Sequence, residues 1–125
     1  MTKEIMKRRM KLFAVRIIKI IDQMPRNQTS MVTGNQLLRS ATSMAANYSA
    51  CCRAKSINDF INKLKVVEEE TDETIFWLDL LEETGFFNEE KLSAIKTEAN
   101  EILSIIVASI KTVRRNSATS QNRKS

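Results

Sequence analysis

The sequence predicts an all-α protein that folds as an antiparallel, up-down-up-down four-helix bundle. Only two glycines and one proline occur in 125 residues, so turn signals are few and the segments between them are long. The alternation of β-branched and aromatic residues expected of strands is missing. Apolar residues instead recur at spacings of three and four in four long segments joined by short loops, which is typical of a bundle. At this length we expect one domain with one core.

The first helix is predicted over about residues 3–24, and Pro25 ends it because the residue before a proline avoids the α region. Its apolar stripe consists of Met6, Met10, Phe13, Ile17, Ile20 and Met24. A second apolar set lies away from this stripe and consists of Ile5, Leu12, Val15 and Ile18. One helix of a monomeric bundle needs a single apolar face, so the second set indicates contact with another subunit.

The second helix is predicted over about residues 31–54, with Thr29 or Ser30 as its cap. Its positions beside the buried stripe are nearly all small, which allows a neighbouring helix to approach closely. Arg39, Ser43 and Asn47 follow one another at intervals of four and form a polar line. Two interpretations fit this line: an interface with a partner, or a solvated edge with hydrogen bonds between helices.

The third helix is predicted over about residues 57–84. Ser56 with Asp59 three residues later is a helix start, and Gly85 is a C-terminal cap. The buried side should follow a heptad pattern: Phe60, Leu64, Val67, Thr71, Thr74, Leu78 and Leu81.

The fourth helix is predicted over about residues 89–115, with Asn88 as its cap. Its heptad line consists of Leu92, Ile95, Ala99, Ile102, Ile106, Ser109 and Val113. Residues 116–125 form a polar tail without an apolar anchor, and we expect this tail to be disordered.

Charge is strongly segregated along the chain. Residues 1–55 hold eleven Lys and Arg against Glu4 and Asp22, a balance of +9. Residues 56–85 hold Lys63 and Lys65 against nine acids, a balance of −7. Such a pattern indicates either a polyanionic partner for the basic half or packing of one half against the other.

The basic residues near the two termini form a candidate nucleic-acid site. In an up-down-up-down bundle the start of the first helix and the end of the fourth lie at the same end. The candidate residues are Lys3, Lys7, Arg8, Arg9, Lys11, Arg114 and Arg115. Together they would contact phosphates of RNA or DNA without reading sequence. No aromatic residue is interleaved with them for base stacking, and the alternative role of the charges is solubility.

No catalytic, metal or cofactor site is predicted. The chain has no His, and residues 31–54 have no acid, which excludes the Glu and Glu-x-x-His ligand set of a di-metal bundle. Nucleophile–base pairs and a Gly-rich phosphate loop are missing as well. Cys51 and Cys52 are adjacent on a helix and point about 100° apart, which makes a disulfide between them geometrically poor. The chain has no other Cys and no His, which excludes a zinc site. No apolar run reaches the length of a membrane span, and we expect a cytoplasmic protein that is not an enzyme and has no membrane partner.

Several stretches resemble a known bacterial family, the S23 or 23S rRNA intervening-sequence proteins, which include the accessory variability determinant of diversity-generating retroelements. The stretches are F-A-V-R-I-I-K at 13–19, Q-L-L-R-S-A-T-S-M-A-A-N-Y at 36–48, C-R-A-K-S-I-N-D-F-I-N-K-L at 52–64 and E-E-T-D-E-T-I-F-W-L-D-L-L at 69–81. The resemblance implies an antiparallel four-helix bundle that assembles as a homopentamer with a basic surface. It also implies that some members bind nucleic acid or a reverse transcriptase.

Two functions are therefore expected as alternatives. The first is a non-catalytic oligomer that binds RNA or DNA through its basic end. The second is a protein-interaction scaffold or accessory subunit without a nucleic-acid role, in which the basic face pairs with the acidic helix at about 57–84 of a neighbouring subunit.

Overall fold

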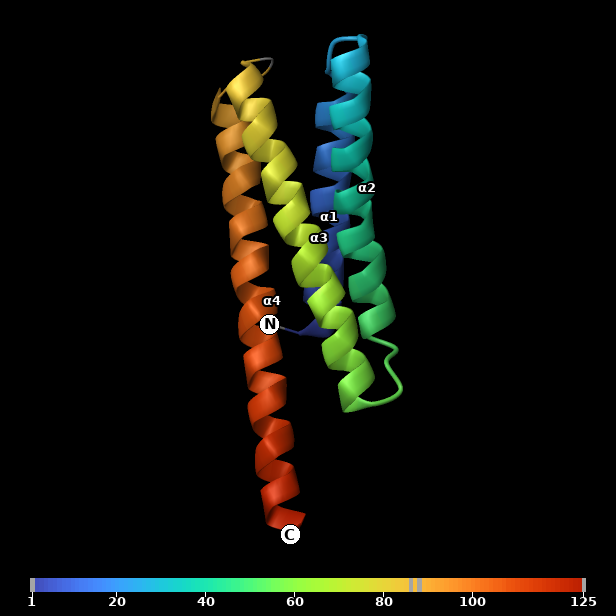
Figure 1. The fold of residues 1–125 in the computed structure, drawn as a ribbon, viewed down its shortest axis with the longest axis vertical. Helices are drawn as coiled ribbons and strands as arrows, with labels where there is room; N and C mark the ends of the chain where they lie inside the picture. The colour runs from blue at the N-terminus through green and yellow to red at the C-terminus, as the bar shows by residue number, and fades with distance from the viewer. Residues whose placement is uncertain (1, 86, 88, 125) are drawn as a thin grey trace.

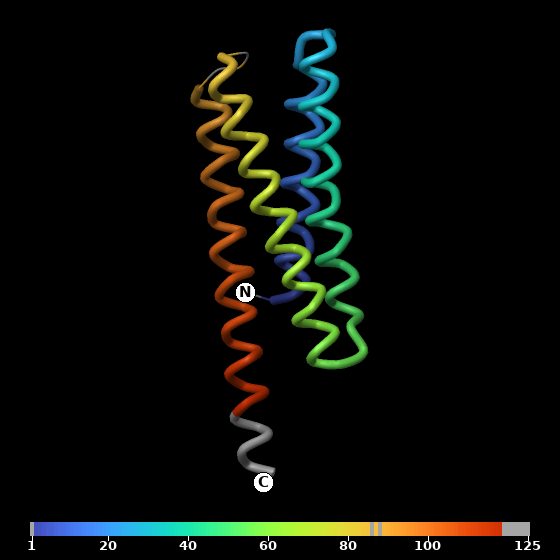
Figure 2. Tube along the Cα trace, viewed as in Figure 1, coloured from blue at the N-terminus to red at the C-terminus, as the bar shows by residue number. Residues whose placement is uncertain are grey.

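Four antiparallel helices make up the described chain (Figure 1). The computed structural model describes residues 2–85, 87 and 89–124, with side chains through residue 118. The helices are α1 (Lys3–Asp22), α2 (Gln28–Cys51), α3 (Ile57–Thr84) and α4 (Glu89–Lys124). The trace in Figure 2 shows successive helices running in opposite directions. The predicted all-α four-helix bundle is thus confirmed.

The helices do not contact one another equally. The contact between α2 and α3 is the most extensive, followed by α3 with α4 and α1 with α2. The contact between α1 and α4 is much thinner. Within the described residues α1 and α3 share no such backbone contact, so they lie on a diagonal of the bundle.

Side-chain caps fix the helix starts. The Thr2 hydroxyl accepts a hydrogen bond from the Ile5 amide at 3.1 Å, and the Ser56 hydroxyl accepts one from the Asp59 amide at 3.1 Å. At α2 the capping residue is Asn27, whose Oδ1 accepts from the Ser30 amide at 2.8 Å. The prediction of Thr29 or Ser30 as the cap was wrong, and α2 begins three residues earlier than predicted.

Two helices end slightly before their predicted limits. The amides of Gln23 and Met24 donate to carbonyls three residues earlier, so α1 ends in a tightened turn after Asp22. The amides of Arg53 and Ala54 do the same, and α2 ends at Cys51 rather than at residue 54. At the end of α3, Gly85 has φ +70°, the left-handed conformation that glycine adopts without strain.

The core follows the predicted stripes. Five members of the α1 stripe are no more than 4% exposed, and the α3 line from Leu64 to Leu81 is buried. Ser40 of α2 and Thr74 of α3 are fully buried, and the Thr74 hydroxyl donates to the Ser40 oxygen at 2.9 Å. The small side chain of Ser40 lets the two helices approach, and the hydrogen bond satisfies both hydroxyls.

Helix α4 continues to Lys124, nine residues beyond its predicted end at 115. The prediction of a disordered tail therefore differs from the structure over residues 116–124. No glycine or proline occurs after residue 85, so nothing in the sequence interrupts the backbone hydrogen bonds of the helix. Figure 1 shows α4 extending past the ends of the other helices. Asn88, the predicted cap, lies outside the described residues.

None of the helices is both long enough and apolar enough, within the described range, to cross a membrane.

Candidate nucleic-acid interface

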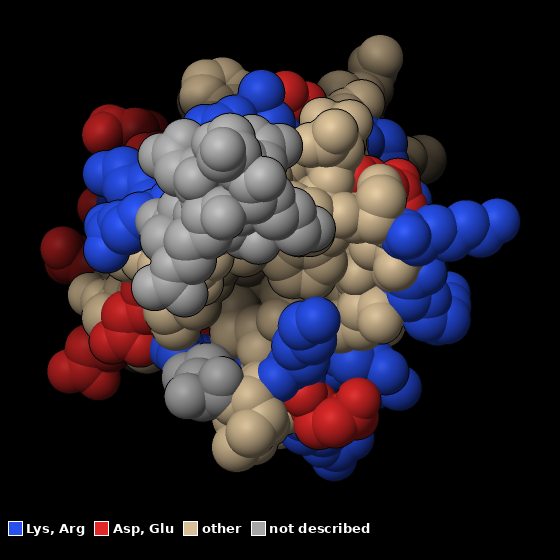
Figure 3. Space-filling view, turned by 90° about the horizontal axis from the view of Figure 1, so that it is seen from below, with Lys and Arg blue, Asp and Glu red and all other residues tan. Residues whose placement is uncertain are grey.

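The beginning of α1 and the distal part of α4 lie at one end of the bundle. Thr2, Lys3 and Met6 line the same hollow as α4 residues between Ile105 and Val113. Figure 3 looks onto this end and shows Lys and Arg side chains around its rim, with some Asp and Glu among them. The structure thus brings Lys3 close to Val113, the residue before Arg114 and Arg115, whereas Arg9 lies further along the bundle, opposite Glu98 and Glu101.

Arg9 faces inward to α4. Its Nε and Nη2 donate to the two carboxylate oxygens of Glu98 at 2.6 and 2.9 Å, and Nη2 also donates to Glu101 at 2.6 Å. The side chain is only 23% exposed. The hydrogen bond from Arg9 holds the pKa of Glu98 below its ordinary value. Arg9 therefore links α1 to α4 and is poorly placed to contact a phosphate.

The other six candidate cations fall into two groups. Lys7 lies 3.8 Å from the Glu4 carboxylate, and Lys3 Nζ lies 4.7 Å from the centre of the Phe60 ring. The remaining four are exposed, as Lys3 is, but among the described residues no ion pair or ring contact involves them: Arg8, Lys11, Arg114 and Arg115. We call these four the exposed cations, and they are the candidate residues best placed to meet a polyanion.

Aromatic side chains lie beside the basic residues, although the sequence showed none interleaved with them. Phe60 from α3 and Tyr48 from α2 line the hollow that also holds Lys3. The contact between Lys3 and Phe60 spans the α1–α3 diagonal. Sequence spacing gave Phe60 a place on the buried α3 line but could not show which residue of α1 lies next to its ring.

The two cysteines lie at the same end. Both are free thiols, Cys51 buried and Cys52 partly buried. Burial raises the pKa of Cys51 to about 11, so this thiol stays protonated at neutral pH. It donates a weak hydrogen bond to the Phe60 carbonyl at 3.4 Å. In the described structure it has the character of a core residue.

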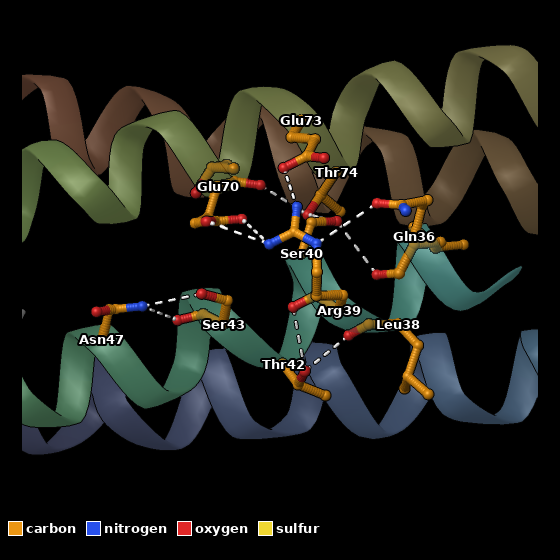
Figure 4. Close-up of polar contacts among 12 residues, drawn as sticks. Gln36, Leu38, Arg39, Ser40, Thr42, Ser43, Asn47, Glu70, Glu73 and Thr74 are labelled. Atoms are coloured by element: carbon orange, nitrogen blue, oxygen red, sulfur yellow. Dashed lines mark hydrogen bonds and ion pairs between the residues drawn. The ribbon is translucent and has the colours of Figure 1, made fainter. Parts of the chain in front are cut away.

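The polar line of α2 makes contacts within the chain (Figure 4). Arg39 pairs with Glu70 of α3 at 3.3 Å and also with Glu73, whose pKa it holds below the ordinary value. The Asn47 side-chain amide donates to the Ser43 carbonyl and hydroxyl, both at 2.9 Å. Arg39 therefore supports the second interpretation of this line, hydrogen bonding between helices.

The acids of α3 are partly neutralised by neighbouring cations. Lys96 of α4 lies 2.6 Å from Asp79 and 2.8 Å from Glu82. Lys63 pairs with Asp59 at 2.6 Å. No group of three or more His, Cys, Asp or Glu side chains that could hold a metal ion occurs among the described residues. Lys63 and Lys96 lie outside the basic residues 1–55, so it is the pairing of Arg39 with Glu70 and Glu73 that joins the basic half to the acidic helix.

The model of one protein family, the 23S rRNA-intervening sequence proteins, matches residues 2–108. The chain belongs to this family. A crystal structure of a protein of unknown function from the S23 ribosomal protein family of Bacteroides thetaiotaomicron is similar, with a TM-score of 0.82 and 35% sequence identity. The match covers 89% of this chain and 99% of the Bacteroides chain. No curated protein matches. The predicted membership of the intervening-sequence protein family is thus confirmed.

Proposed function

We propose that this intervening-sequence protein is a non-catalytic oligomer that binds RNA or DNA through its exposed cations. The observation that carries the proposal is their position. Arg8 and Lys11 are exposed on the first half of α1, and Arg114 and Arg115 are exposed on the distal part of α4, just after Val113, which lines a hollow together with Lys3. The family name, which refers to an intervening sequence in 23S rRNA, supports the same partner class.

Binding of this kind has a measurable signature, because cations that contact phosphates release counterions. The logarithm of the binding constant then falls linearly with the logarithm of salt concentration, by about 0.9 per phosphate contacted in duplex DNA and about 0.7 in a single strand. Loss of two contacts should therefore reduce that slope by about 1.4 to 1.8.

The test compares two double charge reversals that change the net charge equally. Arg8→Glu with Lys11→Glu alters the proposed site. Arg26→Glu with Lys91→Glu alters exposed cations at the opposite end, where Lys91 Nζ donates to Gln23 at 3.1 Å. The probes are a labelled RNA hairpin and a labelled DNA duplex, followed by fluorescence anisotropy across a salt series. We expect the first variant to weaken binding and flatten the slope, and the second to change little. Failure of the natural sequence to bind either probe at low salt would falsify the proposal.

A scaffold without a nucleic-acid role is the second candidate, and exposed apolar side chains on two helices favour it. On α1, Ile5, Leu12, Val15 and Ile18 are between 39% and 56% exposed, among Arg8 and Lys11. On α3, Phe76 and Leu80 are 56% and 38% exposed, and Asp72 and Glu83 share their face. A basic apolar face on one subunit could pack on the acidic apolar face of the next. Repeating this head-to-tail contact forms a ring, consistent with the pentamer that the family resemblance implies.

Light scattering separates the two functions with the same α1 variant. If the α1 face docks on α3, Arg8→Glu with Lys11→Glu lowers the mass of the assembly. Adding Asp72→Lys with Glu83→Lys should then restore the mass, because the two faces have exchanged their charges. Restored mass without restored nucleic-acid affinity assigns the α1 cations to both roles. A natural protein with the mass of one chain contradicts the scaffold.

A further inference from the structure

The basic end of the bundle contains a groove lined by residues of all four helices. Two adjoining hollows of about 460 and 390 Å³ share Lys3, Phe60 and Val113. One extends to Cys52 and Lys55, and the other extends to Tyr48 and Ser109. We call the combined hollow the end groove. Residues of both α1 and α4, the two neighbouring helices with the thinnest contact, line it.

The end groove combines an aromatic ring with cations. Phe60 is partly buried against the core, which holds its ring in place, and Lys3 Nζ lies 4.7 Å from the ring centre. Lys55 is on the lining, and Arg114 and Arg115 directly follow Val113 on α4. An aromatic surface beside a basic track is the combination by which proteins hold single-stranded nucleic acid.

We propose that the end groove receives an unpaired nucleotide, whose base stacks on Phe60 while Lys3 contacts a neighbouring phosphate. This inference rests on the proposed function and names the class of nucleic acid, single-stranded rather than duplex. A base inside a duplex has both faces covered by its neighbours and cannot stack on a ring that lies in a groove.

The contact between Lys3 and Phe60 indicates how a base could replace the Lys3 ammonium on the ring. An exposed ammonium covers the ring, attracted by its π electrons, and this contact is weak in water. Lys3 is long and lies in the first turn of α1, so it can turn to a phosphate while the base takes its place. Tyr48 and Ser109 line the same space. The Ser109 hydroxyl donates to the Ile105 carbonyl at 2.8 Å, so its oxygen can still accept a hydrogen bond from a base edge.

The test replaces Phe60 and compares two probes. Phe60→Leu keeps an apolar side chain but removes the aromatic face, whereas Phe60→Tyr keeps it. Phe87→Leu is the matched control, because Phe87 is also partly buried against the core but lies between α3 and α4, at the other end of the bundle. The probes are a labelled oligo-dT strand and the same strand annealed to oligo-dA, and circular dichroism confirms that each variant is folded.

We expect the natural protein to bind the single strand about tenfold more tightly than the duplex. Phe60→Leu should lose about tenfold in affinity for the single strand alone, and Phe60→Tyr and Phe87→Leu should lose little. If Phe60→Leu leaves single-strand affinity unchanged while Arg8→Glu with Lys11→Glu still weakens binding, the end-groove assignment fails and the proposed function stands. If the natural protein binds neither probe and no RNA hairpin, both fail.

Discussion

At the scale of single residues, Arg9 shows how burial changes the role of a charge. Its guanidinium forms a two-point hydrogen-bonded pair with Glu98, and both side chains are less than a quarter exposed. Such pairs are stronger than exposed ion pairs, because the planar fork matches the carboxylate and water screens it less. We therefore assign Arg9 a structural role.

Replacing Arg9 by methionine should lower the free energy of unfolding by about 1–2 kcal/mol at neutral pH, because it leaves Glu98 without its partner. The pKa of Glu98 is lower in the folded chain than its ordinary value. Its stabilising contribution is therefore complete above that ordinary value, about 4.5, and is lost as the pH falls through the lower folded pKa. Urea denaturation across this range measures the difference between the two proteins.

The difference should shrink in acid, and a gap that stays constant down to about pH 3 contradicts the assignment. Lys111→Met is a suitable control, since Lys111 is exposed on α4 and should contribute little.

The sequence could not have assigned Arg9 and Phe60 correctly. Glu98 and Glu101 are spaced to share a face of α4, which is the only signal for Arg9 in the chain. That signal is useful only if one knows which turn of α1 lies opposite Glu98. Arg9 and Glu98 are about ninety residues apart in the sequence, so their proximity is not evident from it. Phe60 contacts Lys3 across the bundle diagonal. The periodicity of the sequence indicates which face of a helix is buried, but it does not predict a contact of this kind between two helices.

At the scale of the helix, the two glycines have opposite roles. Gly34 lies in α2, where an added Cβ would lie 3.4 Å from Met24 Sδ and 3.5 Å from Ile21 Cγ2, an ordinary van der Waals contact. Gly85 ends α3 with φ +70°, and an added Cβ would meet nothing within 4 Å. Space therefore permits a methyl group at both positions, but the backbone conformation favours it only at Gly34.

Gly34→Ala should raise the free energy of unfolding by up to about 1 kcal/mol through helix propensity. Gly85→Ala should lower it by about 1 kcal/mol, because the left-handed conformation strains a residue with a Cβ. Chemical denaturation of the two variants measures both changes, and equal signs would refute the distinction.

Helix boundaries could be predicted from the sequence where a single nearby residue was suited to cap the helix. Ser56 and Gly85 give α3 the predicted limits of 57 and 84. At the start of α2, several residues in the loop could cap, and the extended backbone of Asn27 decides among them. The polar segment after residue 115 lacks an apolar anchor, but it also lacks a helix breaker, and composition alone could not weigh the two.

At the scale of the whole molecule, α4 is longer than the core that supports it. Its last buried apolar side chain, among those described, is Ile110, and Val113 is partly buried. A chain that ends at Asn116 should keep its melting temperature within about 1 °C, because none of the described side chains after that residue belongs to the core. It should lose helical circular dichroism for the missing turns. A clearly lower melting temperature would show that the extension packs on the bundle.

The thin contact between α1 and α4 gives the bundle an order of opening. Each helix packs on the next one in the chain, and the most extensive contact is the one between α2 and α3. The first and last helices, α1 and α4, contact each other only weakly. Separating α1 from α4 disrupts the least packing, so this opening costs the least free energy and exposes backbone amides to solvent most often. Hydrogen–deuterium exchange should therefore be slowest in the centres of α2 and α3. Arg9→Met should accelerate exchange in α1 and α4 first, because it removes the ion pair that links these two helices.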